Sequence, residues 1–218
     1  MSSAVSSEVT SLTLMVDAHE KRDVAVIDVP GAYLHASMKD FVILCLEGNI
    51  VDYMVEACPE VYEPFVEIVN GKKVLYLQLL KALYGCVQSA LLWYELFSST
   101  LEKEGYVINP VEPCVANKII NGKVCTMLWY VDDVKISHVD EKIVSNVINM
   151  LEKWFGKLTI NRGSLKVLVV VSNGHSLALS VGNQSPIGYR KTVYWVRSTI
   201  HGPGYFVDFS QQIHHICT

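Results

Sequence analysis

Two Asn-Gly pairs constrain the fold of this chain more than any other feature of its sequence. Asn70-Gly71 and Asn121-Gly122 each lie between apolar runs. Both central residues of a type I′ turn need positive φ, so Asn-Gly in this setting is the strongest short-range signal for a β-hairpin. The sequence therefore predicts two antiparallel hairpins, FVEIV/KKVLYLQL and CVANKII/KVCTMLWYV.

The second hairpin is predicted to continue into a third strand. After its last apolar run the chain passes Asp132-Asp133 and enters VKISHV, which has the composition of a strand. We therefore expect three consecutive antiparallel strands with the two aspartates at the second turn. Lys135 alternates with Val134 and Ile136, which favours a solvent-exposed position for its side chain.

A strand upstream of these hairpins ends in another carboxylate. In residues 23–31, DVAVIDVPG, the alternation puts Val26 and Asp28 on one face, and Pro30-Gly31 ends the strand. A sheet that sets this strand beside the aspartate turn would bring three carboxylates together. Carboxylates that lie close together raise one another's pKa unless a cation neutralises them. Hard oxygen ligands of this kind favour Mg²⁺. For any one of these aspartates alone, an ordinary turn residue is the simpler interpretation.

Apolar spacing predicts three helices, over residues 8–20, 89–105 and 140–156. Leu12 is placed on the apolar side of the first helix and Trp154 on that of the third. Ser, Asp and Gly residues at the helix ends are suitable caps. Helices packed on one face of an antiparallel sheet define an α+β fold.

The composition indicates a folded chain outside the membrane. Of its 218 residues 50% are hydrophobic, which is enough for a sizeable core, and no run approaches the ~18 apolar residues of a membrane span. The segment MSSAVSSEVTS lacks the features of a signal peptide, so we expect an intracellular protein.

A net charge of −4 gives no global attraction to nucleic acid. The six cysteines form no CxxC pair and the seven histidines no zinc spacing, which predicts core thiols and no zinc site.

Three blocks of sequence carry a family resemblance. They are DVPGAYLHA at 28–36, KALYGCVQS at 81–89 and YVDD at 130–133. In order and spacing they resemble the reverse transcriptase domain of Ty1/copia-type LTR retrotransposons. Local matches at 112–114 (EPC) and 158–163 (LTINRG) extend the likeness over residues 8–164.

The resemblance implies an α+β fold with a polymerase palm-like antiparallel sheet, helices packed on one face, partial fingers and an irregular C-terminal tail. It divides the chain into a palm with partial fingers, residues 1–164, and a divergent tail, residues 165–218. It also implies that Asp28, Asp132 and Asp133 are the catalytic residues and the ligands of Mg²⁺ or Mn²⁺.

Three further residues are implied to bind substrate. Tyr33 matches an aromatic residue that excludes a ribose 2′-hydroxyl, although a core tyrosine is an equally good interpretation. Gln88 matches a glutamine near the nucleotide or template, and its alternative role is simply to begin a helix. Tyr130 precedes the aspartates on the same hairpin. Lys81 is expected to be solvated, and Trp93-Tyr94 fits helix packing better than base stacking.

The implied function is RNA-directed DNA synthesis. An RNA or DNA template-primer and dNTPs would be the partners, and two metal ions would assist attack by the primer 3′-hydroxyl. Basic fingers strands, a primer grip, a thumb and an RNase H segment are not recognisable, which predicts a truncated piece of a longer polyprotein with weak or no activity. The alternative is a non-enzymatic retroelement remnant that at most binds protein or nucleic acid. The implied location is a cytoplasmic particle or the nucleus.

Overall fold

The structure is a computed structural model that describes residues 5–162, 164–171, 175–182 and 194–196, with side chains described through residue 162. The chain divides into two compact units. Of the described residues, those up to 32 and those from 93 onward belong to the first unit, and residues 33–92 form the second. The first unit is therefore discontinuous in sequence.

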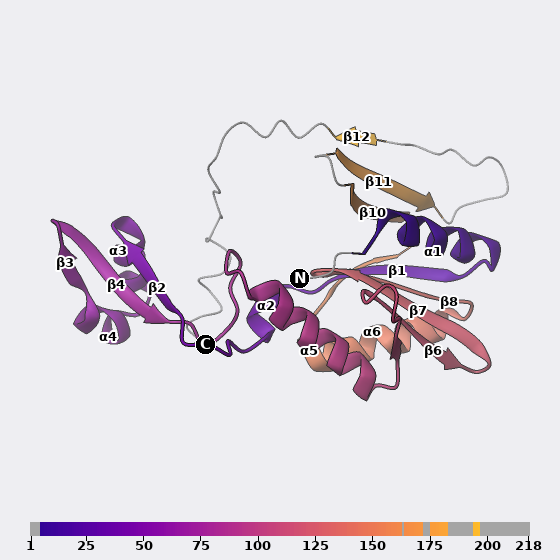
Figure 1. Cartoon of the computed structure of the whole chain (residues 1–218), viewed down its shortest axis with the longest axis horizontal. Coiled ribbons are helices and arrows are strands. Elements are labelled where there is room, and N and C mark those ends of the chain that lie inside the picture. The colour runs from indigo at the N-terminus through magenta and orange to yellow at the C-terminus, as the bar shows by residue number, and fades with distance from the viewer. Residues whose placement is uncertain (1–4, 163, 172–174, 183–193, 197–218) are drawn as a thin grey trace. The chain divides into compact units, whose positions relative to one another are not determined.

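The first unit is built on a six-stranded antiparallel sheet in the order β5-β6-β7-β8-β1-β9 (Figure 1). The strands are β1 (Asp23–Asp28), β5 (Val107–Ile108), β6 (Val115–Ile120), β7 (Lys123–Tyr130), β8 (Asp133–His138) and β9 (Thr159–Arg162). The predicted three-strand meander is confirmed as β6-β7-β8. β1 pairs antiparallel with β8, which places the upstream carboxylate strand beside the meander.

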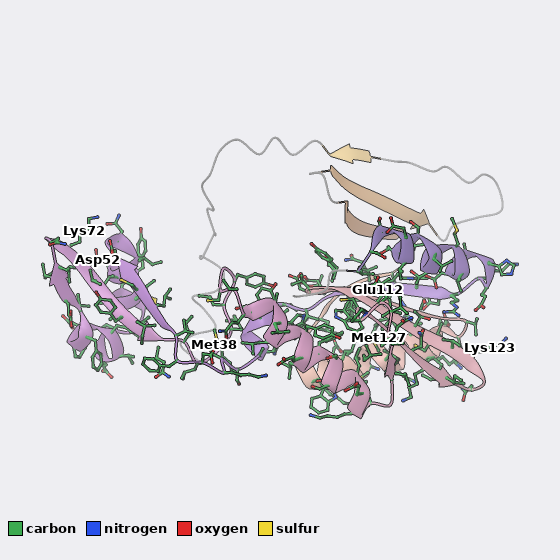
Figure 2. All side chains as sticks on the ribbon, in the orientation of Figure 1. Met38, Asp52, Lys72, Glu112, Lys123 and Met127 are labelled. Carbon is green, nitrogen blue, oxygen red and sulfur yellow. The ribbon has the colours of Figure 1, made fainter. Side chains whose placement is uncertain are left out.

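Both predicted Asn-Gly hairpins are confirmed. Asn121 and Gly122 have φ values of 52° and 74° and join β6 to β7, as a type I′ turn requires. Lys123 follows this turn at the outer end of the hairpin, whereas Met127, further along β7, is buried inside the unit (Figure 2). The first two residues of β7 are thus exposed, and the next five are buried as the strand runs into the sheet.

Helices cover both faces of the six-stranded sheet (Figure 1). On one face, aromatic side chains of α5 (Ser89–Lys103) and α6 (Glu141–Phe155) pack together, and Phe97 of α5 meets Trp129 of β7. On the other face lies α1 (Ser7–His19), which reaches Lys135 of β8. The predicted packing of helices on one face of the sheet therefore holds for α5 and α6, whereas α1 packs on the opposite face.

The buried side of α1 differs from the predicted apolar side. Its buried residues are Thr10, Leu14 and Asp17, whereas Leu12 is 60% exposed. The prediction was wrong because this helix faces a charged patch of the sheet, where Asp17 forms an ion pair with Lys135. Lys135 is 2% exposed, so its predicted solvent-exposed position was wrong as well.

The third predicted helix, α6, is confirmed with its capping residues. The Asp140 side chain accepts a hydrogen bond from the Lys142 amide at 2.9 Å, and Gly156 ends the helix. Val147 and Leu151 are buried as predicted, but the end of the stripe differs, since Phe155 is buried and Trp154 is 46% exposed. The buried position is the one that meets the aromatic side chains of α5.

In the second predicted helix, α5, Ser89 lies inside the helix and is not the capping residue before it. Ser89 is the first residue of α5, and its hydroxyl donates to the Leu83 carbonyl at 2.6 Å.

The predicted core thiols are found at Cys114 and Cys125, but Cys45 is exposed on a strand. Cys217 lies outside the described residues.

The second unit contains a three-stranded sheet in the order β2-β4-β3. Its strands are β2 (Ile43–Glu47), β3 (Glu67–Val69) and β4 (Lys72–Gln78), and its helices are α2 (Ala32–His35, which begins at the boundary), α3 (Asn49–Ala57), α4 (Pro59–Tyr62) and the short 3-10 helix η1 (Glu63–Phe65). A small core of Val51, Met54, Tyr62 and Leu75 joins the helices to the sheet. Asp52 on α3 and Lys72 on β4 lie outside that core (Figure 2).

Three further strands follow residue 163: β10 (Ser164–Val171), β11 (His175–Gly182) and β12 (Tyr194–Val196). They form a third antiparallel sheet, in the order β10-β11-β12. All three strands fall within, or begin just before, residues 165–218, where the sequence predicted an irregular tail. The remainder of residues 165–218 lies outside the described part. No helix in the described ranges is long and apolar enough to cross a membrane.

Candidate carboxylate site

Three predicted site residues lie at one end of β1 and β8. Asp28, the last residue of β1, is directly opposite Asp133, the first residue of β8. Directly opposite residues of an antiparallel pair share a face and have Cβ atoms about 4.5–5.5 Å apart. Asp132 precedes Asp133 in the turn, and its carbonyl oxygen accepts a hydrogen bond from the Val29 amide at 3.0 Å. Two segments about a hundred residues apart in sequence are thereby joined at one point.

The turn that carries Asp132 has an unusual backbone. It joins β7 to β8 through Val131 and Asp132, and Val131 has a φ of 55°. Positive φ is a genuine outlier for a β-branched residue. The Trp93 indole on α5 donates to the Val131 carbonyl at 2.6 Å, so α5 and the chain after β1 both hold this turn.

The carboxylates interact electrostatically. Burial raises the pKa of Asp28, and the neighbouring Asp132 raises it further. Burial likewise raises the pKa of Asp133, with added contributions from Asp132 and Asp28. In the described part of the chain no ion pair reaches Asp28 or Asp133. Their repulsion can be relieved by a proton or by a bound cation.

The donor set fits a hard divalent cation. It offers carboxylate oxygens alone, which are the ligands that Mg²⁺ and Mn²⁺ prefer. Asp28 and Asp133 are directly opposite each other in the sheet, and Asp132 precedes Asp133 in the chain. As placed, no three His, Cys, Asp or Glu side chains among the described residues are close enough to hold a metal ion together. The chemistry of the donors thus fits the implied cofactor, while the three side chains do not yet converge.

The predicted substrate-binding residues divide between the two units. Tyr130, the last residue of β7, is directly opposite Asp133 and belongs to the first unit. Tyr33 and Gln88 belong to the second. Tyr33 is 9% exposed and its ring centroid lies 4.2 Å from that of Tyr84, as a core tyrosine would be.

Gln88 and Lys81 both make contacts within the second unit. The Gln88 side-chain amide donates to the Asp40 carboxylate at 2.5 Å. The Lys81 ammonium donates to the His35 carbonyl at 3.3 Å and to the Ser37 hydroxyl at 3.4 Å. Lys81 is exposed, in agreement with its predicted solvation, although it also joins two segments of the unit.

The packing roles predicted for Trp93 and Tyr94 are confirmed. Trp93 is buried against Phe97 and Phe155, and the Tyr94 ring stacks with that of Trp129 at 6.3 Å. Both rings therefore take part in packing between α5 and its neighbours.

Sequence reasoning missed a buried polar network near the carboxylates. Asp17 of α1 forms ion pairs with Lys135 and Arg22, and Arg22 donates to the Thr126 hydroxyl at 3.0 Å. Burial lowers the pKa of Lys135, and the Asp17 carboxylate opposes that shift. The available signal was Asp17 itself, an acid three residues after Leu14 on the buried side of a helix.

Comparison with known proteins identifies the class to which this chain belongs. The family model described as "Reverse transcriptase (RNA-dependent DNA polymerase)" matches residues 1–167, and the chain is a member of that family. Within the family it is of the Ty1/copia type, as the sequence motifs indicated. The Retrovirus-related Pol polyprotein from transposon TNT 1-94 of Nicotiana tabacum is 28% identical over 151 residues. The match covers 68% of this chain and 10% of that polyprotein, so the chain spans a tenth of its relative.

A solved structure of telomerase from Candida albicans, in complex with the TWJ fragment of telomeric RNA, is also similar. Its TM-score is 0.33 at 10% sequence identity, over 86% of this chain and 35% of that one. A TM-score that low supports no statement about function.

Proposed function

We propose that this chain is a nucleotidyl-transfer domain for RNA-directed DNA synthesis, with Asp28, Asp132 and Asp133 as its catalytic carboxylates. The observation that carries the proposal is the direct pairing of Asp28 with Asp133 across β1 and β8. Family membership supports the reaction class, and the register supports these residues as the site. The substrates proposed are an RNA or DNA template-primer and dNTPs.

The carboxylates supply negative charge at one end of the sheet. Burial, with a further contribution from neighbouring acids, raises the pKa of Asp28 and Asp133, so a positively charged partner would stabilise both carboxylates. A divalent cation bound there, Mg²⁺ or Mn²⁺, would lower the pKa of a primer 3′-hydroxyl and neutralise charge on the incoming triphosphate. The supported turn keeps Asp132 beside the other two acids.

The substrate-binding roles remain proposals. Tyr130 lies beside Asp133 on the neighbouring strand, where its phenol ring can border the bound nucleotide. Tyr33 and Gln88 are proposed to contact the sugar and the base or template. The Asp40 contact occupies one amide hydrogen of Gln88, which leaves the amide oxygen and its second hydrogen for substrate.

Primer extension by the purified chain tests this function. An RNA template, a DNA primer, dNTPs and Mg²⁺ or Mn²⁺ are supplied, and we expect weak incorporation, as the truncation predicts, that Asp132→Asn reduces below detection. The matched control is Asp140→Asn, which removes the same charge in the same unit. Asn is as good an N-cap as Asp, so this control is expected to fold and to keep activity.

The outcomes separate the function from its cation site. Incorporation by Asp132→Asn at the wild-type rate would refute the assigned chemistry. If the wild-type chain incorporates nothing, its melting temperature with and without Mn²⁺, compared with that of Asp28→Asn, shows whether the carboxylates bind a cation. If the wild-type chain shows no incorporation and no stabilisation by a cation, the result favours the alternative, a non-enzymatic module that binds protein or nucleic acid.

A further inference from the structure

A buried ammonium lies on the same sheet face as the carboxylates. Lys135 of β8 contacts Asp17 of α1, and both side chains are almost completely buried. Side chains alternate along a strand, so Lys135 points to the same face as Asp133, two residues earlier. Arg22, also buried, lies 3.9 Å from the Asp17 carboxylate and is bound in addition to Glu20 at 2.8 Å.

The register places this ammonium within reach of the site. Asp133 is opposite Asp28, and Lys135 is opposite Val26, so Lys135 is a diagonal neighbour of Asp28. Diagonal neighbours in an antiparallel pair are about 7–8 Å apart, which long side chains can span. The flexible four-carbon stem of lysine makes it well suited to do so.

The carboxylates would attract a cation so placed. Asp28 and Asp133 are partly buried and directly opposite each other, and among the described residues neither has an ion-pair partner. The Lys135 ammonium nevertheless contacts Asp17. The acid on α1 therefore competes successfully with the site for the same positive charge.

We propose that Asp17 is a positioning residue that holds the Lys135 ammonium away from Asp28 and Asp133. The site carboxylates are thereby left to bind an external cation, and this last step rests on the proposed function. Without Asp17, Lys135 would be buried and unpaired, which is strongly unfavourable. The ammonium would then turn to Asp133 or Asp28 and block the site from within.

A reversal of sign in urea denaturation tests the proposal without metal or nucleotide. In the full wild-type chain Asp133→Asn removes repulsion from Asp28, so the urea midpoint is expected to rise. In an Asp17→Asn background the same change removes the new partner of Lys135, so the midpoint is expected to fall. With Lys135→Met added to that background, Asp133→Asn is again expected to raise the midpoint. A shift in the same direction with and without Asp17 would overturn the proposal.

Mn²⁺ binding, measured by electron paramagnetic resonance, gives an independent readout. We expect Asp17→Asn to weaken binding about tenfold, the effect of one nearby charge in a partly solvated site, and Lys135→Met to restore it in that background. Unchanged affinity in Asp17→Asn would contradict the proposal. If the wild-type chain binds no Mn²⁺, the proposed cation site fails, and the urea measurement still decides the role of Asp17.

A variant that replaces the whole pair covers the case in which Asp17→Asn does not fold. Asp17→Leu with Lys135→Met exchanges a buried ion pair for apolar side chains, which is often neutral for stability. Because the ammonium is already held away in the wild-type chain, we expect Mn²⁺ affinity to be unchanged in this double variant. An affinity that rises tenfold or more would show that Lys135 competes for the site despite Asp17, and would overturn the proposal.

Discussion

The strand β7 is flanked by two turns of two residues each, Asn121-Gly122 at its beginning and Val131-Asp132 at its end. In the first turn, φ is positive at both residues, which Asn and Gly adopt readily. In the second turn, φ is positive at Val131, a position for which glycine is the usual residue. The two turns have equal length and lie in the same sheet, but only in the first turn do the residue types favour the backbone conformation that they adopt.

The difference lies in what surrounds each turn. Asn121 and Gly122 are exposed, and a Cβ built on Gly122 meets no atom within 4 Å. Val131 and Asp132 instead accept hydrogen bonds from Trp93 and Val29. Unfavourable backbone conformations persist where neighbouring structure imposes them, and such places are often functional. The second turn is therefore shaped by tertiary contacts, at the point where the carboxylates meet.

Among the differences between the two turns, the contact of Trp93 on α5 with the second turn is expected to have the largest effect on stability. Trp93→Ala removes a buried aromatic ring and the hydrogen bond to Val131, and we expect it to lower the free energy of unfolding by about 3–5 kcal/mol. Urea denaturation of the full chain measures the change. Trp154→Ala removes a partly exposed ring of the same type and is the control. Equal losses in the two variants would mean that α5 gives the turn no special support.

The backbone of the turns gives a smaller effect with opposite signs. Val131→Gly relieves the strain of positive φ and is expected to raise the free energy of unfolding by about 1 kcal/mol. Gly122→Ala introduces the same kind of strain at the other end of β7 and is expected to lower it by about 1 kcal/mol. Thermal or urea unfolding of both variants measures the pair. A loss of stability in Val131→Gly would show that the valine side chain contributes more through packing than its backbone costs.

The same contrast explains what the sequence could predict. Asn121-Gly122 encodes its turn in two residues, and Asp140 encodes the start of α6, so both were predicted locally. The pairing of β1 with β8 depends on residues about a hundred positions apart. Local patterns placed Asp28 at a strand end, and only the resemblance to a family put it beside Asp133. The register then showed the two acids directly opposite each other.

Errors arose where one face of an element was hidden by another part of the chain. Alternation along β8 separates Lys135 from Val134 and Ile136, but it does not reveal that α1 covers the second face. For α6, the spacing correctly placed Val147 and Leu151 in the core, but it did not distinguish Trp154 from Phe155 at the last turn, where contact with the aromatic side chains of α5 buries Phe155. The roles of Tyr33, Gln88 and Tyr130 in substrate binding stay predictions, because contacts within the protein alone do not test them.

The smallest effect expected is a pH dependence that belongs to the second turn alone. Burial and neighbouring acids raise the pKa of Asp28 and Asp133, so near and above the unfolded value of about 4 the native state binds more protons than the unfolded state. Their contribution to stability is therefore greatest in acid and is lost as the pH rises through the raised native pKa. Partial exposure screens the repulsion, which keeps the effect small.

Urea midpoints of the wild-type chain and Asp133→Asn, measured from pH 4 to pH 7, test this dependence. Asp133→Asn removes the titrating group and its repulsion, so its advantage over the wild-type chain should grow as the pH rises. Added Mg²⁺ should reduce that advantage at neutral pH if the carboxylates bind it, because the cation stabilises only the chain that keeps all three acids. Glu112→Gln, an acid elsewhere in the same unit, controls for general charge (Figure 2). Parallel curves for the wild-type chain and Asp133→Asn would mean that the acids at the second turn do not repel one another, and the turn would then differ from Asn121-Gly122 only in its backbone.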